Sequence, residues 1–99
     1  MLIVTGTMNV PPEQAEAMKA AASEVAIATR AEKGCRVYAF WRSVEDPGCF
    51  RVYEEWDDGD CLKAHGKSDH IAVYRKKLAE IGAFGRDIKM FEPGVMTSL

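Results

Sequence analysis

The feature that most constrains the fold is a pair of strand-like segments joined by a tight turn. Residues 35–43 and 50–56 both alternate side chains between two faces, which is the period of a β-strand. Between them, Glu45-Asp46-Pro47-Gly48 has the composition of a turn. The two segments are therefore predicted to pair as a hairpin, and the rest of the chain must cover it.

The flanking segments extend this hairpin to a six-part order, in which the second helical part consists of two short helices. Prolines 11 and 12 end a first alternating segment, and an amphipathic pattern rich in alanine follows them. The predicted elements are strands at residues 1–10, 35–43, 50–56 and 86–92, and helices at 12–31, 58–67 and 68–81. The order β-α-β-β-α-β predicts an α+β fold of the ferredoxin-like split type, with an antiparallel sheet and helices on one face.

Length and composition limit the classes of function. Ninety-nine residues are expected to form one domain, with a core from about 2 to 93 and a short tail at 94–99. A net charge of −2 with scattered basic residues argues against nucleic acid, and no apolar run is long enough for a membrane span. Cys35, Cys49 and Cys61 form no C-x-x-C pair, which favours a reducing cytoplasm.

The second strand carries large apolar groups on both faces, which predicts that both faces of the sheet are covered. A sheet with one solvated face normally alternates apolar and polar residues. Helices cover one face only, and a second copy of the chain is the natural cover for the other, so a homodimer is expected. The residues behind this prediction are Val37, Ala39 and Trp41 on one face, and Tyr38, Phe40 and Tyr53 on the other.

Groups able to do chemistry gather between Phe50 and His70. The only two histidines, His65 and His70, follow the third strand, and imidazole is an acid–base group near neutral pH. Their spacing of five residues, with no third ligand nearby in sequence, is poor for a metal, so none is predicted. The alternative is structural: each imidazole bonds a nearby carbonyl or carboxylate at the helix break.

Glu54 shares a strand face with apolar neighbours, which predicts either a partner or a raised pKa. Arg36, Arg51 or a histidine are the candidate partners. Several aromatic side chains are candidate walls of a pocket for a flat substrate. They are Trp56, Tyr74, Tyr38 and Phe50.

These residues also carry a family resemblance. Glu54-x-Trp56 is followed by His65 nine residues after the tryptophan, and then by Ser68-x-His70. Upstream lie Glu32-x-Gly34-Cys35-x-x-Tyr38 and the Asp46–Pro47 turn. From about Leu2 to Pro93, the chain resembles the antibiotic biosynthesis monooxygenase (ABM) family. That resemblance implies a dimeric α+β barrel.

The resemblance implies a cofactor-free monooxygenase that oxidises a small phenol or quinol with dioxygen. His65 or His70 would act as the base, Glu54 would orient it, and Trp56 and Tyr74 would form walls. A rival is an isomerase or lyase acting on a small carbonyl or phosphorylated metabolite, similar to autoinducer-processing relatives. Heme degradation is a weaker rival, because those relatives have Trp at the position of His65 and His at that of Arg75. A non-enzymatic dimer that binds a small molecule is the remaining alternative.

Overall fold

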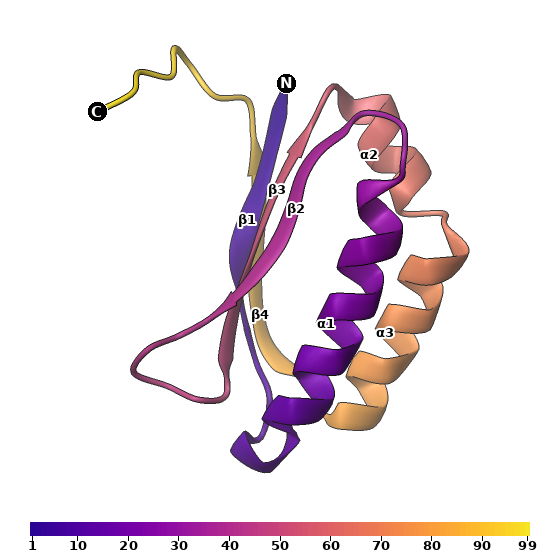
Figure 1. The fold of residues 1–99 in the computed structure, drawn as a ribbon, viewed down its shortest axis with the longest axis vertical. Coiled ribbons are helices and arrows are strands. Elements are labelled where there is room, and N and C mark those ends of the chain that lie inside the picture. The colour runs from indigo at the N-terminus through magenta and orange to yellow at the C-terminus, as the bar shows by residue number, and fades with distance from the viewer.

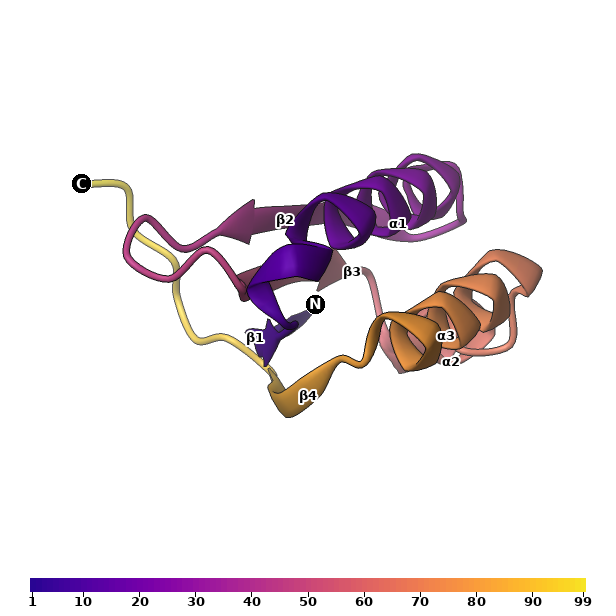
Figure 2. The same cartoon turned by 90° about the horizontal axis from the view of Figure 1, so that it is seen from below.

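The computed structural model describes residues 1–99 and has the predicted order of elements. Four antiparallel strands form one sheet in the order β2-β3-β1-β4, and three α-helices lie on one of its faces (Figures 1 and 2). The elements are β1 (Leu2–Asn9), η1 (Pro12–Gln14), α1 (Ala15–Arg30), β2 (Cys35–Arg42), β3 (Cys49–Trp56), α2 (Gly59–His65), α3 (Asp69–Ile81) and β4 (Phe84–Phe91). The predicted α+β, ferredoxin-like class is therefore confirmed.

Local sequence signals explain where the helices begin and end. Asp58 caps α2 by accepting a hydrogen bond from the Cys61 N–H, and Ser68 caps α3 by accepting one from Ile71. Gly82 ends α3 in the left-handed region, with φ of 86°, which a glycine adopts without steric cost. The break between α2 and α3 follows from these caps, and it sets the positions of both histidines.

The core lies between the helices and the covered face of the sheet. Small alanine side chains on α1 let this helix approach β2 and β3 closely, while Met18 and Val25 fill the space between them. Phe50 and Trp56 on β3 are almost fully buried against this layer. Burial of such side chains contributes roughly 1.5–3 kcal/mol each.

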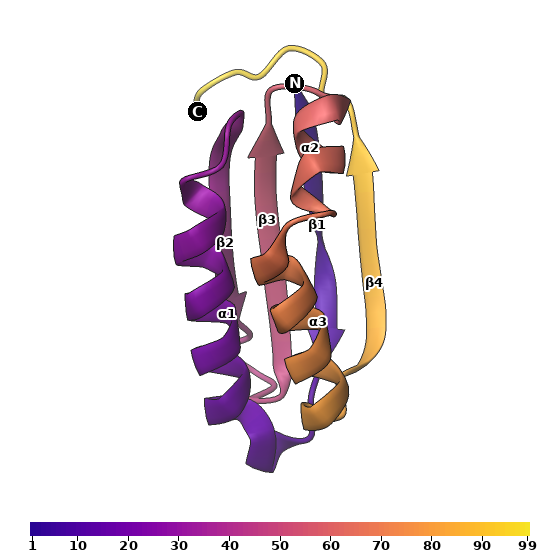
Figure 3. The same ribbon diagram turned by 90° about the vertical axis from the view of Figure 1, so that its right-hand side faces the viewer.

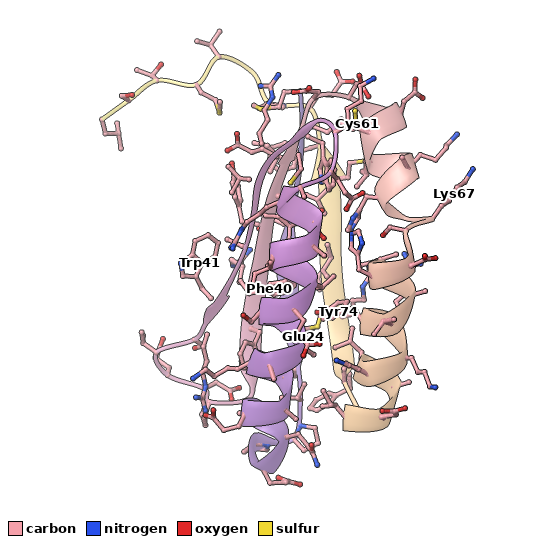
Figure 4. All side chains as sticks on the ribbon, turned by 45° about the vertical axis from the view of Figure 1, so that its right-hand side comes forward. Glu24, Phe40, Trp41, Cys61, Lys67 and Tyr74 are labelled. Atoms are coloured by element: carbon pink, nitrogen blue, oxygen red, sulfur yellow. The ribbon has the colours of Figure 1, made fainter.

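The opposite face of the sheet has no helix over it. The pairing register places Val37, Ala39, Trp41 and Tyr53 on this open face. Figure 4 shows Trp41 pointing away from the helices, and it is 55% exposed.

The predicted grouping of Tyr38 and Phe40 with Tyr53 on one face of the sheet was wrong, because Tyr53 pairs with Ala39 on the open face. Tyr38 belongs to the buried core, and Phe40 packs against that core. Alternation separates two faces of a strand but does not identify the one that meets the helices, and here both faces of β2 are apolar. The apolar groups that argue for a partner are therefore those of the open face.

Strand β4 is an edge strand that the helices leave uncovered. Figure 3 shows α1 in front of β2, and α2 and α3 in front of the middle strands, with no helix in front of β4. Its residues are mostly exposed, although it pairs along β1. Separately, none of the helices combines the length and the apolar character that crossing a membrane requires.

Candidate active site

A turn between α1 and β2 brings an acidic side chain to the histidines. Glu32 lies in this turn, where its N–H donates to Thr29 and its carbonyl accepts from Cys35. The next bend is at Gly34, with φ of 79°, and a Cβ there would lie 2.3 Å from Cys61 Sγ. Because the Asp57 N–H donates to the Gly34 carbonyl at 2.9 Å, the turn is held against the end of β3.

One carboxylate oxygen of Glu32 contacts both imidazoles. Its Oε2 lies 2.7 Å from His65 Nδ1 and 2.8 Å from His70 Nε2. His65 is the last residue of α2, and His70 is in the first turn of α3, so the helix break turns both rings toward the same point. We call Glu32, His65 and His70 the histidine cluster.

The Glu32 contact fixes the protonation pattern of neutral His65. A carboxylate only accepts hydrogen bonds, so Nδ1 carries the proton and Nε2 keeps the free lone pair. Nε2 has no protein partner and is not sealed from solvent. The ring is held between Trp56 and Tyr38, with centroid distances of 5.0 and 5.3 Å. This is the arrangement of an oriented general base.

A cavity of about 610 Å³ lies beside His65, between the sheet and helices α2 and α3. Eleven of its seventeen lining residues are hydrophobic, contributed by β1 to β4, α2 and α3. Its volume is in the usual range for small-molecule sites, and its mostly apolar wall suits an aromatic ring. Of the two histidines, only His65 lines it; His70 lies at a smaller pocket between α1 and α3.

Glu54 forms part of the sheet side of this cavity. It is 7% exposed, and its Oε1 accepts a hydrogen bond from Trp56 Nε1 at 2.8 Å. Burial raises the pKa of this carboxyl to about 7, and the Trp56 hydrogen bond and the charge of Arg86 offset only part of that effect. Glu54 is thus a carboxyl that exchanges a proton near neutral pH.

Two tyrosines line the same cavity as hydrogen-bond donors. Burial raises the pKa of Tyr38 and of Tyr74 above the ordinary value of a phenol, so both stay protonated. The Tyr74 hydroxyl reaches Met8 Sδ at 3.7 Å, a weak acceptor. Tyr74 and Phe40 lie toward the interior between sheet and helices in Figure 4.

The residues predicted for the site separate into two groups. His65, Glu54, Tyr38 and Tyr74 line the cavity. His70 is connected to it only through Glu32. Trp56 lies behind His65 with no exposed surface, and Phe50 is buried elsewhere in the core, so neither forms a wall.

The carboxylate that holds the histidines is Glu32, not Glu54 as the sequence led us to expect. Glu54 faces its own neighbour Trp56 and contacts neither imidazole. Glu32 was recognisable only as a member of the family pattern, where no role was assigned to it. Its separation from the histidines, 33 and 38 residues, hides the contact from any local spacing argument.

The histidine cluster also has three side chains of the types that bind metal ions. Its three candidate ligand atoms lie within 4.8 Å of one another, and the fold supplies the third ligand that local spacing lacked. However, the Glu32 oxygen accepts from both rings at hydrogen-bond distances, and a metal would have to replace both protons. The cluster as it stands is a complete hydrogen-bonded network.

Comparison with known proteins gives the family. The sequence profile described as antibiotic biosynthesis monooxygenase matches residues 1–77. The chain belongs to the antibiotic biosynthesis monooxygenase family. Among curated proteins, no sequence matches this chain.

Solved structures share the fold of this ABM protein over almost its whole length. A Deinococcus radiodurans protein, provisionally assigned as an antibiotic biosynthesis monooxygenase, has a TM-score of 0.93 and 25% identity, covering 100% of this chain and 98% of its own. A Caulobacter crescentus protein with the same provisional assignment has a TM-score of 0.87 and 25% identity, covering 95% and 90%. A conserved protein from Methanosarcina mazei gives 0.86 and 24%, covering 94% and 92%, which supports the fold alone.

Proposed function

We propose that this ABM protein oxidises a small phenolic or quinol-type aromatic with dioxygen, without metal or organic cofactor. One observation carries the proposal: His65 is held through Nδ1 by Glu32, while its Nε2 is free beside a mostly apolar cavity. An oriented base next to a mostly apolar cavity is suited to the deprotonation of a bound phenol.

The reaction needs few steps from the protein. His65 Nε2 takes the phenolic proton, which makes the ring electron-rich. A ring carbon then forms a bond to dioxygen, and the resulting peroxide takes up a proton at its outer oxygen. The O–O bond then breaks as the ring carbon loses its hydrogen as a proton. The oxygen left on the ring carbon becomes a carbonyl, and the leaving hydroxide takes up that proton to form water. The products are a quinone and one water per dioxygen, so the electrons balance without an external reductant.

The cavity would support this chemistry by positioning the substrate against His65. Its apolar lining would hold a flat ring between the sheet and α3, and the Tyr38 and Tyr74 hydroxyls would donate to substrate oxygens. Glu54 would return a proton to the peroxide, because its pKa of about 7 leaves part of it protonated at neutral pH.

We infer further that the working unit is a cytoplasmic homodimer. The open face of the sheet presents Val37, Ala39, Trp41 and Tyr53 with no helix above them. The tail after β4 projects toward that side in Figure 1 and carries exposed Val95, Met96 and Leu99. Sedimentation at micromolar concentration should give twice the mass of one chain, and a monomer would contradict the inference. The three free cysteines agree with a reducing compartment.

The test of function is oxygen uptake by two matched variants. Screening quinols with an oxygen electrode, in buffer stripped of metals, should find a substrate. His65→Gln should then lower the rate by about 10²–10⁴-fold, the usual contribution of a general base. His70→Gln should lower it less, because His70 does not line the cavity. Both should keep a near-normal melting temperature, since the glutamine NH₂ can still donate a hydrogen bond to the Glu32 carboxylate.

Each other outcome has a distinct meaning. Full activity of His65→Gln would remove the base from the proposal, and unfolding of both variants would make the histidines structural. Turnover of a substrate without oxygen uptake would favour the isomerase alternative. Binding with no turnover at all would favour a non-enzymatic binding protein.

A further inference from the structure

The cavity has an excess of positive charge that the proposed reaction does not use. Among its lining residues, Arg75, Arg86 and Lys89 are basic, and Glu54 is the one acid. Lys89 is already paired with Asp87 at 2.8 Å. The two arginines make no ion pair with any carboxylate of the chain. They lie on opposite sides of the cavity, Arg75 on α3 and Arg86 on the uncovered strand β4.

Of the two arginines, Arg86 has the fewer hydrogen-bonding partners. It makes no hydrogen bond and no ion pair within the chain. It shares the cavity-facing side of β4 with Ile88 and Met90, which pair with β1 opposite Gly6 and Val4. Its charge is felt by Glu54 and by Tyr74, because it lowers the pKa of each against the larger effect of burial. The guanidinium therefore lies near enough to the cavity to act on a bound molecule.

Arg75 approaches from the helix side and is tied only weakly. Its Nη1 donates to the Gly66 carbonyl at 3.3 Å, next to His65, and its other donors have no partner. Gly66 itself lines the cavity. Both arginines are exposed, so they mark the opening of the cavity rather than its buried wall. The site thus combines an apolar interior that ends at His65 with two unpaired cations at its entrance.

We propose that the substrate is an aromatic compound bearing a carboxylate, which Arg86 and Arg75 bind at the opening while the ring enters the apolar interior. A planar guanidinium is suited to a carboxylate because it can donate two parallel hydrogen bonds. A neutral aromatic would leave both arginines without a partner at the edge of an apolar surface. The identity of the reaction rests on the proposed function, but this preference for an anion concerns binding alone.

The test uses three probes that differ at one substituent: 2,5-dihydroxybenzoate, its methyl ester and hydroquinone. Titration calorimetry on the full-length protein should show that the carboxylate binds about tenfold or more tightly than the ester, with hydroquinone no better than the ester. The preference should narrow as salt rises, because both arginines are exposed.

Variants assign the preference to residues. Arg86→Gln should remove most of the difference between acid and ester, and Arg75→Gln should remove part of it. The matched control is Arg51→Gln, because Arg51 lies on the other face of the sheet, where it donates to Thr5 Oγ1. Equal affinity for acid and ester, a preference that survives Arg86→Gln, or failure of all three probes to bind would each overturn the proposal.

Oxygen uptake separates this inference from the proposed function. A carboxylate preference that depends on Arg86, with no oxygen consumed by any aromatic acid, would keep the anion site and reject the oxygenase. Oxygen consumption with equal affinities for acid and ester would keep the oxygenase and reject the anion site.

Discussion

Two glutamates lie near the same cavity, and their surroundings give them opposite tasks. Glu32 is on a loop, where its Oε2 accepts hydrogen bonds from two imidazoles. Glu54 is on a central strand, where burial dominates and a single neutral indole N–H is its only hydrogen-bond partner. The first holds two imidazoles in one orientation, and burial raises the pKa of the second to about 7.

The two glutamates differ in their hydrogen-bond donors more than in their burial. The Glu32 side chain is 18% exposed and Glu54 is 7% exposed, so both are largely removed from water. What separates them is that the fold delivers His65 and His70 to Glu32, and only Trp56 to Glu54. The following predictions exchange or remove those partners.

Next to the loss of His65 itself, Glu32→Gln should have the largest effect on activity, lowering oxygen uptake by about 10²–10³-fold. An amide can turn its NH₂ toward His65 Nδ1, which would favour the tautomer with the proton on Nε2 and remove the base. The oxygen electrode measures the rate, and Glu55→Gln is the control, because Glu55 accepts only from Tyr53 on the open face. If Glu32→Gln works at the normal rate, Glu32 does not orient the base.

Glu54→Gln should remove the proton donor proposed for the peroxide, and it should also change stability in a pH-dependent manner. The folded pKa of about 7 lies above the ordinary value of 4.5, so the native state binds the proton more tightly than the unfolded chain does. Stability therefore falls as pH rises from about 4.5 to about 7, by on the order of 3 kcal/mol in total. Glutamine keeps the acceptor for Trp56 without the charge.

Urea denaturation at pH 5 and pH 8 measures how the free energy of unfolding depends on pH. The unmodified protein should lose stability between the two pH values, and Glu54→Gln should lose much less. Glu55→Gln again serves as the control and should follow the unmodified protein. Parallel pH profiles for the two proteins would mean that Glu54 has an ordinary pKa.

Removal of metals should have the smallest effect, which is none. Two N–H donors already satisfy the Glu32 oxygen, so we expect no metal to hold the histidine cluster together. Dialysis against EDTA should leave oxygen uptake and melting temperature unchanged. Loss of activity that one added divalent metal restores would show that the cluster is a metal site.

Much of the fold was predictable because its signals are local. Strand alternation, the prolines before α1, and Asp58 and Ser68 as caps each act within a few residues. The elements therefore match the prediction apart from their ends: β4 begins at Phe84 rather than Arg86, and α2 ends at His65 rather than Lys67.

The site was less predictable because it depends on contacts between distant segments. Strand alternation put Trp56 and Phe50 on the same face as Glu54, but it does not say how far each residue lies from the uncovered edge at β4. For the same reason, the alternation pattern predicts neither the contacts of Glu32 nor the position of Arg86 at the cavity. Predicting either contact requires the arrangement of the strands and helices, which depends on the whole chain.

The sharing of Glu32 Oε2 has a consequence for the net charge of the histidine cluster in the proposed reaction. With one proton on each imidazole and none on the carboxylate, the histidine cluster carries a single negative charge. When Nε2 accepts a third proton, that charge becomes zero. A lone imidazole packed against Trp56 and Tyr38 would have to become a buried cation, which burial disfavours strongly. In the proposed reaction, proton uptake would cancel a charge instead of creating one, which suits a base that is almost fully buried.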